Sequence, residues 1–207
     1  MTRVGFLINP IAGMGGRVGL KGTDGVAAEA ARLGATPLAN ARALETLRAL
    51  KQRLDQERVP APIEWLTCEG KMGADALDAA GFAPVDLVHN PKGSSSTEDT
   101  KKAVQAFMAR HVDLVLFCGG DGTARDICSV TGKATPILGI PSGVKMYSSV
   151  FGVGPAHTAD MLVRFCRGEI GLARCCPTCC GRPTASIVQA AIAPRPIGGT
   201  SWWWMSI

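Results

Sequence analysis

Several common sequence features are missing from this 207-residue chain, and each absence excludes a class of protein. No apolar run approaches the roughly 18 residues that span a bilayer. The first ten residues also lack the apolar core and cleavage site of a signal peptide. There is no Gly-x₄-Gly-Lys-(Ser/Thr) P-loop, and Gly13, Gly15 and Gly19 miss the Rossmann glycine spacing. The three histidines show no metal-ligand spacing. We therefore expect a cytoplasmic protein without a membrane partner.

The formal net charge of +5 raises the question of nucleic-acid binding. The basic residues of segment 48–58 alternate with acidic ones, which is typical of a solvated helix face and not of a basic stripe. Much of the excess positive charge comes from a C-terminal segment without acidic residues. With 46% hydrophobic residues the chain can bury a core. These observations favour a globular protein with no nucleic-acid partner.

The first 173 residues alternate between strand-like and helix-like segments, which predicts an α/β domain. We expect a Rossmann-like three-layer fold in which helices cover a mostly parallel sheet. Strands are predicted at 3–9, 62–68, 86–90, 112–118 and 136–140, and helices at 40–58, 72–80, 95–108, from 124 and at 156–167. Asn40 is predicted to cap the first of these helices, and Ser95 with Glu98 to form a capping box at the third.

The composition changes abruptly after residue 173. Residues 174–207 contain no Asp, Glu, Lys, Leu or Phe, and they hold four of the eight cysteines. This predicts a domain at 1–173 followed by an irregular tail at 174–207. Three interpretations of the tail stay open. It is a disordered segment that was not selected to fold, such as an out-of-frame translation would give; or a zinc site at Cys175–Cys180; or a functional tail of unknown type. The four earlier cysteines are predicted to be reduced.

The segment 119–123 (GGDGT) carries the strongest chemical signal. It follows the near-continuous apolar strand 112–118 and precedes a helix. Glycines let the backbone come close to a ligand, and the amides at a helix N-terminus point at an anion. Asp121 in such a loop suits a residue that holds Mg²⁺ or accepts a proton from an attacking hydroxyl. The alternative is a plain glycine turn; the combined pattern favours a phosphate loop for phosphoryl transfer.

Three segments together resemble one kinase superfamily. Residues 119–123 resemble the GGDGT signature of the NAD kinase, diacylglycerol kinase and phosphofructokinase superfamily. Residues 9–16 (NPIAGMGG) look like the loop after the first strand of these kinases, and residues 136–143 (PILGIPSG) match the strand and glycine turn after the GGDGT helix. The whole span 1–173 looks most like the ATP-NAD kinase family of prokaryotes.

The resemblance implies that the γ-phosphoryl group of ATP is transferred, with Mg²⁺, to the 2′-hydroxyl of NAD to give NADP. Asp121 would be the catalytic acid/base residue or the Mg²⁺ partner. The implied nucleotide-binding residues are Asn9, Gly13, Gly15, Gly16, Gly119, Gly120, Gly122, Thr123, Gly143 and Lys145. ATP and NAD are then the small-molecule ligands, and homo-oligomers are expected because superfamily kinases often assemble.

The chain departs from its relatives in two places. The lipid kinases carry Asn-Asp soon after their Pro-x-Gly-Thr turn, whereas residues 144–146 here are Val-Lys-Met, which argues against a lipid acceptor. Typical NAD kinases carry an Asn-Glu or Asn-Asp pair and a β-rich second domain further along, and neither is visible. Two alternatives to an NAD kinase therefore stay open: a truncated, non-catalytic nucleotide-binding module, and a related kinase with another hydroxyl acceptor.

Overall fold

The computed structural model describes residues 1–14, 32–57, 63–92, 95–143, 146 and 148–172. Strands and helices alternate along these ranges. In chain order they are β1 (Thr2–Ile8), α3 (Ala39–Glu57), β2 (Ile63–Cys68), the 3₁₀ turn η1 (Gly70–Met72), α4 (Ala74–Ala79), β3 (Val85–His89), α5 (Thr97–Ala109), β4 (Leu114–Gly119), α6 (Asp121–Thr131), β5 (Ile137–Pro141) and α7 (Pro155–Cys166). The expected boundary at residue 173 and the tail lie outside the described ranges and stay predictions.

The five strands form one sheet in the order β3-β2-β1-β4-β5, and every pairing is parallel. The predicted three-layer α/β fold is thus confirmed. The chain places β2 and β3 on one side of β1, then crosses to place β4 and β5 on the other side. In open sheets of this kind ligands bind beyond the carboxyl ends of the strands where the order reverses. Here that point lies between β1 and β4.

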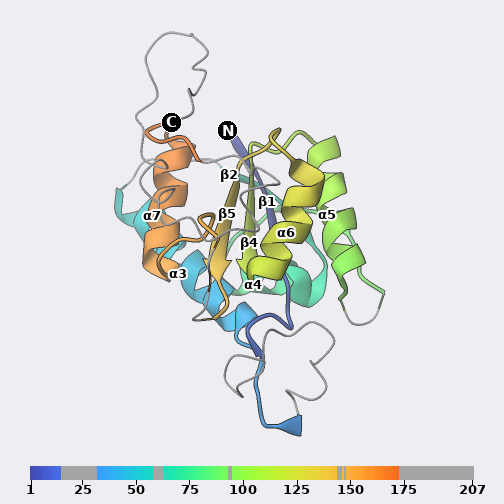
Figure 1. Ribbon diagram of the computed structural model, residues 1–207. Coiled ribbons are helices and arrows are strands. Elements are labelled where there is room, and N and C mark those ends of the chain that lie inside the picture. The colour runs from blue at the N-terminus through green and yellow to red at the C-terminus, as the bar shows by residue number, and fades with distance from the viewer. Residues whose placement is uncertain (15–31, 58–62, 93–94, 144–145, 147, 173–207) are drawn as a thin grey trace, which may run out of the picture.

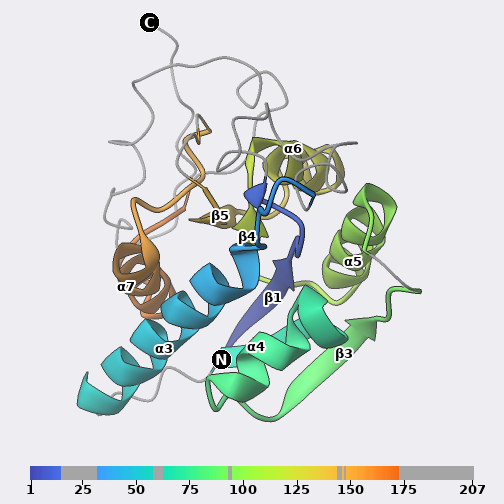
Figure 2. The ribbon, with the colours of Figure 1, turned by 90° about the horizontal axis from the view of Figure 1, so that it is seen from below.

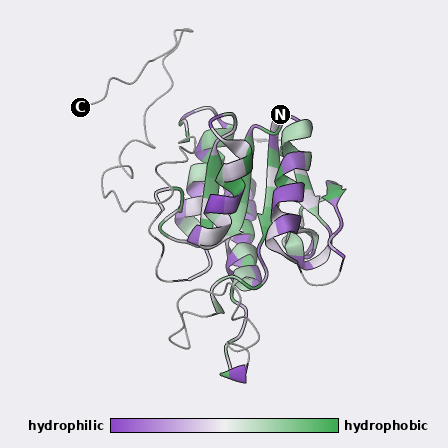
Figure 3. Cartoon of the chain, turned by 45° about the vertical axis from the view of Figure 1, so that its right-hand side comes forward, coloured by the Kyte–Doolittle hydropathy of each residue, from purple (hydrophilic) through white to green (hydrophobic). Residues whose placement is uncertain are grey.

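Side chains on the two faces of the sheet pack against different helices. On β1, Val4, Phe6 and Ile8 join a core cluster with α3, α4 and α7, whereas Leu7 joins a second cluster with α5 and α6. Figures 1 and 2 show α3 and α7 together on one side of the sheet and α5 and α6 on the other. Figure 3 shows the apolar strands enclosed by helices whose outer faces carry the hydrophilic residues. No helix in the described ranges is long and apolar enough to cross a membrane.

Three helix starts differ from the sequence prediction. The capping box of α5 is formed by Ser96 and Asp99, one position after the predicted pair, because each side chain accepts from the backbone amide of the other. Asn40 is not a cap but the second residue of α3, whose hydrogen bonding begins at the carbonyl of Leu38. Helix α6 begins at Asp121, three residues earlier than expected. The last difference brings most of the GGDGT segment into the first turn of a helix.

The cysteines of the domain were expected to be reduced, and this prediction is right for three of the four. Cys68, Cys118 and Cys166 are free, and burial raises the pKa of each thiol, to about 12 for Cys68 and about 11 for Cys166. Cys128 is disulfide-bonded, so the expectation is wrong for that residue.

Candidate functional site

The loops that follow β1, β4 and β5 meet at the carboxyl edge of the sheet. The amide of Asn9 donates to the carbonyl of Cys118 at 2.9 Å, which joins the end of β1 to the end of β4. The amide of Ser142 donates to the carbonyl of Gly119 at 3.1 Å, which joins β4 to the turn after β5. Three segments that are far apart in the sequence therefore lie side by side, at the point where the strand order reverses.

The N-cap residue of helix α6 is a glycine, which has no side chain to cap the helix N-terminus. This residue, Gly120, is extended, with φ −114° and ψ −172°, and has no side-chain hydrogen bond. Gly119 must approach the first turn closely, because a Cβ there would lie 2.7 Å from the Cβ and Oγ1 of Thr123. The first-turn amides of a helix, together with its dipole, attract anions. This end of α6 thus offers backbone donors to a phosphate group.

Asn9 ties the first loop to α6. Its Nδ2 donates to Thr123 Oγ1 at 2.9 Å, and its Oδ1 accepts from the amide of Ile11 at 3.3 Å. Thr123 is only 4% exposed. One amide side chain therefore holds the turn after β1 and the first turn of α6 in a common arrangement.

Asp121, the first residue of α6, is half-buried at the same edge. Its Oδ1 accepts from the amide of Ser148 at 3.0 Å, which orients the carboxylate and ties the segment after β5 to α6. Met146 lies over the neighbouring backbone, since a Cβ on Gly120 would be 3.8 Å from its Cε. The segment after β5 thus closes one side of the α6 N-terminus.

The glycine of the first loop is required by its contacts. Gly13 has φ +83°, and a Cβ at this position would lie 2.2 Å from the carbonyl oxygen of Ser142.

Most of the residues proposed from the sequence lie at this edge of the sheet: Asn9, Gly13, Gly119, Gly120, Asp121, Gly122, Thr123 and Gly143. Gly15, Gly16 and Lys145 fall outside the described residues, so their role stays a prediction.

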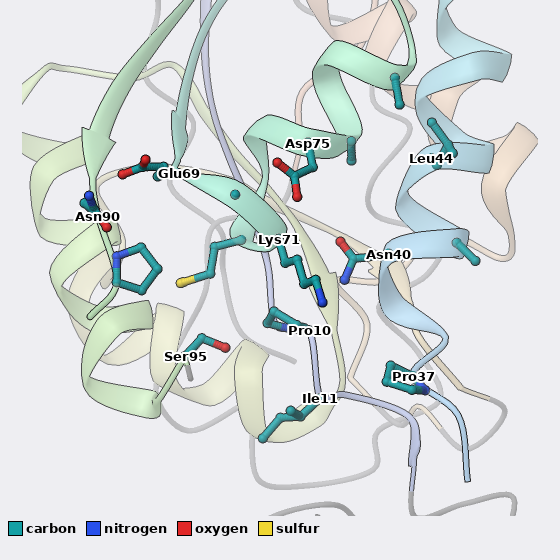
Figure 4. A pocket seen from close by; sticks show the side chains of 16 residues that line it. Pro10, Ile11, Pro37, Asn40, Leu44, Glu69, Lys71, Asp75, Asn90 and Ser95 are labelled. Carbon is teal, nitrogen blue, oxygen red and sulfur yellow. The ribbon is translucent and has the colours of Figure 1, made fainter. Parts of the chain in front are cut away.

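A pocket of about 920 Å³ lies on the other side of β1, beyond the ends of β2 and β3. Its lining comes from the first loop, the start of α3, the η1–α4 segment and the turn after β3. Figure 4 shows Asn40, Lys71 and Asp75 facing a common space, with Glu69 at its border. The sequence did not predict this pocket, because its lining residues follow three different strands and share no motif. The carboxylates of the segment after β2 were the sequence feature that could have indicated a polar pocket here.

The described residues contain no cluster of three or more His, Cys, Asp or Glu side chains that could hold a metal ion. Asp121 offers a carboxylate in the first turn of α6. Mg²⁺ is commonly held by one or two carboxylates together with substrate phosphates. A single carboxylate at this position therefore fits Mg²⁺ bound chiefly through a nucleotide's phosphates.

The fold and the site define an open α/β protein whose switch point holds a helix N-terminus with glycine at the N-cap position and a carboxylate in the first turn. The family model described as ATP-NAD kinase N-terminal domain matches residues 4–170, and the chain belongs to this family. The resemblance seen in the sequence is thereby confirmed. Comparison with curated proteins and with solved structures gave no significant match. Family membership supports a kinase-type phosphotransferase with ATP as phosphate donor.

Proposed function

We propose that this chain binds ATP at the carboxyl edge of its sheet and transfers the γ-phosphoryl group to the 2′-hydroxyl of NAD, giving NADP. The observation that carries the proposal is the position of Asp121. This carboxylate is the first residue of α6, at the same helix end whose amides would bind phosphate. A carboxylate would repel a phosphate, so its place there is best explained by a role in proton transfer or in Mg²⁺ binding.

Two parts of the carboxyl edge of the sheet, the end of α6 and the pocket beyond β2, have the chemistry to bind different parts of a nucleotide. The end of α6 offers amide donors to phosphates. The pocket beyond β2 carries the carboxylates of Glu69 and Asp75 and the ammonium group of Lys71. Carboxylates accept from ribose hydroxyls and base amino groups but repel phosphates. Its volume of about 920 Å³ is ample for a nucleoside. We place the adenosine of ATP in this pocket and its phosphates at α6, with the end of β1 between them.

In the proposed reaction the 2′-hydroxyl oxygen of NAD attacks the γ-phosphorus. A new P–O bond forms to the ribose, the bond to ADP breaks, and Asp121 accepts the hydroxyl proton. Mg²⁺ would be held chiefly by the phosphates, beside Asp121, and would neutralise part of their negative charge. The Ser148 amide keeps the carboxylate oriented through its hydrogen bond to Oδ1. The α6 amides and the first loop position the phosphates, which is most of what phosphoryl transfer requires of a protein.

The test is NADP formation by the full chain with ATP, Mg²⁺ and NAD, beside Asp121→Asn. Asparagine keeps the shape and the oxygen that accepts from Ser148, but it cannot take a proton. We expect NADP from the wild type and a loss of at least about 100-fold in the variant, a typical contribution of general acid–base catalysis. The variant should still bind Mg²⁺-free ADP, and more tightly than wild type, because one negative charge has been removed.

Three outcomes would each contradict a different part of the proposal. ADP binding without NADP formation would favour a non-catalytic nucleotide-binding module. Consumption of ATP with a different hydroxyl compound, found in a panel of acceptors, would keep the phosphotransferase and replace NAD. Equal NADP formation by Asp121→Asn would remove Asp121 from the chemistry.

A further inference from the structure

The hydrogen bond between Asn9 and Thr123 has a direction. Thr123 Oγ1 accepts from Asn9 Nδ2 at 2.9 Å. The amide of Ile11, which can only donate, faces Asn9 Oδ1, and this fixes which end of the Asn9 side chain faces the threonine. A hydroxyl has one proton and two lone pairs. Since Thr123 accepts from Asn9, its own proton must be directed at a different group.

The proton of Thr123 has no acceptor among the residues that the structure describes, although the side chain is only 4% exposed. A threonine in a helix often donates to the carbonyl four residues earlier. Here that carbonyl belongs to Gly119; it accepts from the amide of Ser142 at 3.1 Å, and no hydrogen bond joins it to Thr123 Oγ1. The hydroxyl is thus a buried donor at the helix end where an anion would bind.

We propose that Asn9 is a positioning residue that fixes Thr123 as a hydrogen-bond donor to a phosphate oxygen of the nucleotide. This inference rests on the proposed nucleotide site and assigns Asn9 a role that does not require contact with the ligand. An ionised phosphate oxygen only accepts, so a hydroxyl helps to bind it only when its proton points toward it. Because Asn9 Nδ2 donates to Thr123 Oγ1, the threonine hydroxyl cannot donate to Asn9 at the end of β1.

The test compares ADP and inorganic pyrophosphate binding to the full chain by calorimetry in four proteins: wild type, Asn9→Ala, Thr123→Val and the double variant. Valine keeps the branched shape of threonine and removes the hydroxyl. We expect Thr123→Val to weaken both probes about tenfold, since a hydrogen bond to a charged group is lost. Asn9→Ala should weaken them by a smaller factor. The double variant should match Thr123→Val alone, because Asn9 acts only through the hydroxyl.

Two further variants separate this role from a structural one. Thr123→Ser keeps the hydroxyl and should bind ADP to within about twofold of wild type. Asn9→Asp presents an acceptor to Thr123, so the hydroxyl turns away from the phosphate, and affinity should fall further than in Asn9→Ala. Thr158→Val is the matched control. Thr158 is another buried threonine near a helix N-terminus, and its hydroxyl donates to the Gly154 carbonyl at 2.9 Å. This control should lose stability but keep ADP affinity.

Independent, multiplicative losses from Asn9→Ala and Thr123→Val would overturn the inference, because Asn9 would then act on the nucleotide directly. Unchanged ADP affinity in Thr123→Val would overturn it as well. A wild-type chain that binds neither ADP nor pyrophosphate would instead overturn the nucleotide site itself, and the role of Asn9 with it.

Discussion

The two glycines that begin the GGDGT segment should have separable roles. A methyl group on Gly119 would lie 2.7 Å from the Cβ and Oγ1 of Thr123 and 2.8 Å from its Cγ2. These contacts are with the first turn of α6, so that turn would have to move. On Gly120 the nearest atoms would be the Cε and Sδ of Met146, at 3.8 and 3.9 Å, which is ordinary contact with a flexible side chain. Gly119→Ala should therefore damage the fold, and Gly120→Ala should damage ligand binding.

The expected magnitudes follow from these contacts. Overpacking typically costs about 1–3 kcal/mol, and at roughly 2–4 °C per kcal/mol the melting temperature of Gly119→Ala should fall by about 2–12 °C. Gly120→Ala loses only the preference of an N-cap for glycine, at most about 1 kcal/mol. Its new methyl group would nevertheless occupy space at the helix end that a phosphate must approach. We expect ADP affinity to fall about tenfold, which corresponds to roughly 1.4 kcal/mol.

The assay combines thermal denaturation without ligand and calorimetry with ADP. Gly154→Ala is the matched control for Gly120→Ala. Gly154 is the extended N-cap of α7, without a side-chain hydrogen bond, and a Cβ there would meet nothing within 4 Å. The control should match the stability loss of Gly120→Ala and leave ADP affinity unchanged. A wild-type melting temperature in Gly119→Ala, or wild-type ADP affinity in Gly120→Ala, would contradict the roles assigned to these two glycines.

Three further predictions concern the rest of the domain. Ser96→Ala should lower the free energy of unfolding in urea by about 1 kcal/mol through loss of the α5 cap, whereas Ser95→Ala should change it by less than about 0.5 kcal/mol; equal effects would contradict the assigned cap. Glu69→Gln should weaken ATP binding several-fold in calorimetry and leave pyrophosphate binding unchanged; equal losses for both ligands would place the nucleoside elsewhere. Burial, with a smaller effect from the charge of Asp99, raises the pKa of Cys68 from 9.0 to about 12. Above about pH 9 the unfolded chain loses a proton that the folded chain keeps. The free energy of unfolding, measured in urea, should therefore fall toward pH 12 by up to about 1.4 kcal/mol per pH unit, and Cys68→Ala should reduce that slope.

The sequence predicted the strands well, because a strand buried on both faces leaves a local signature. Residues 112–118 form a near-continuous apolar run, and β4 (Leu114–Gly119) is buried at every position. The order of the strands in the sheet could not be predicted from the sequence pattern. Alternation of strands and helices predicts a parallel sheet, but it does not say that β4 crosses to the other side of β1. That crossing creates the switch point at which the site lies.

The helix starts show a second limit. Segment 94–96 contains three consecutive serines, followed by Glu98 and Asp99, so two capping boxes fit the local pattern. The structure forms the one with Ser96 and Asp99, and His89 at the end of β3 also contacts Asp99 at 3.0 Å. A contact with a neighbouring strand is not visible to a local pattern.

The candidate site also has a part that the sequence pattern indicates and a part that it does not. The GGDGT segment could be proposed as part of a site from the sequence, because its strand, glycines, carboxylate and helix are contiguous. The pocket could not be predicted, because it is assembled from residues such as Asn40, Glu69 and Asn90, which only the folded sheet brings together.

The proposed nucleotide site is tested most directly by locating the bound phosphate through amide chemical shifts of the ¹⁵N-labelled chain. Titration with ADP should shift the amides of Gly120, Gly122 and Thr123 most strongly, together with the side-chain amide of Asn9. The amides at the start of α7, around Gly154, should not move. Shifts concentrated at α7 or elsewhere, with the α6 amides unchanged, would contradict the claim that this helix end binds the nucleotide's phosphates.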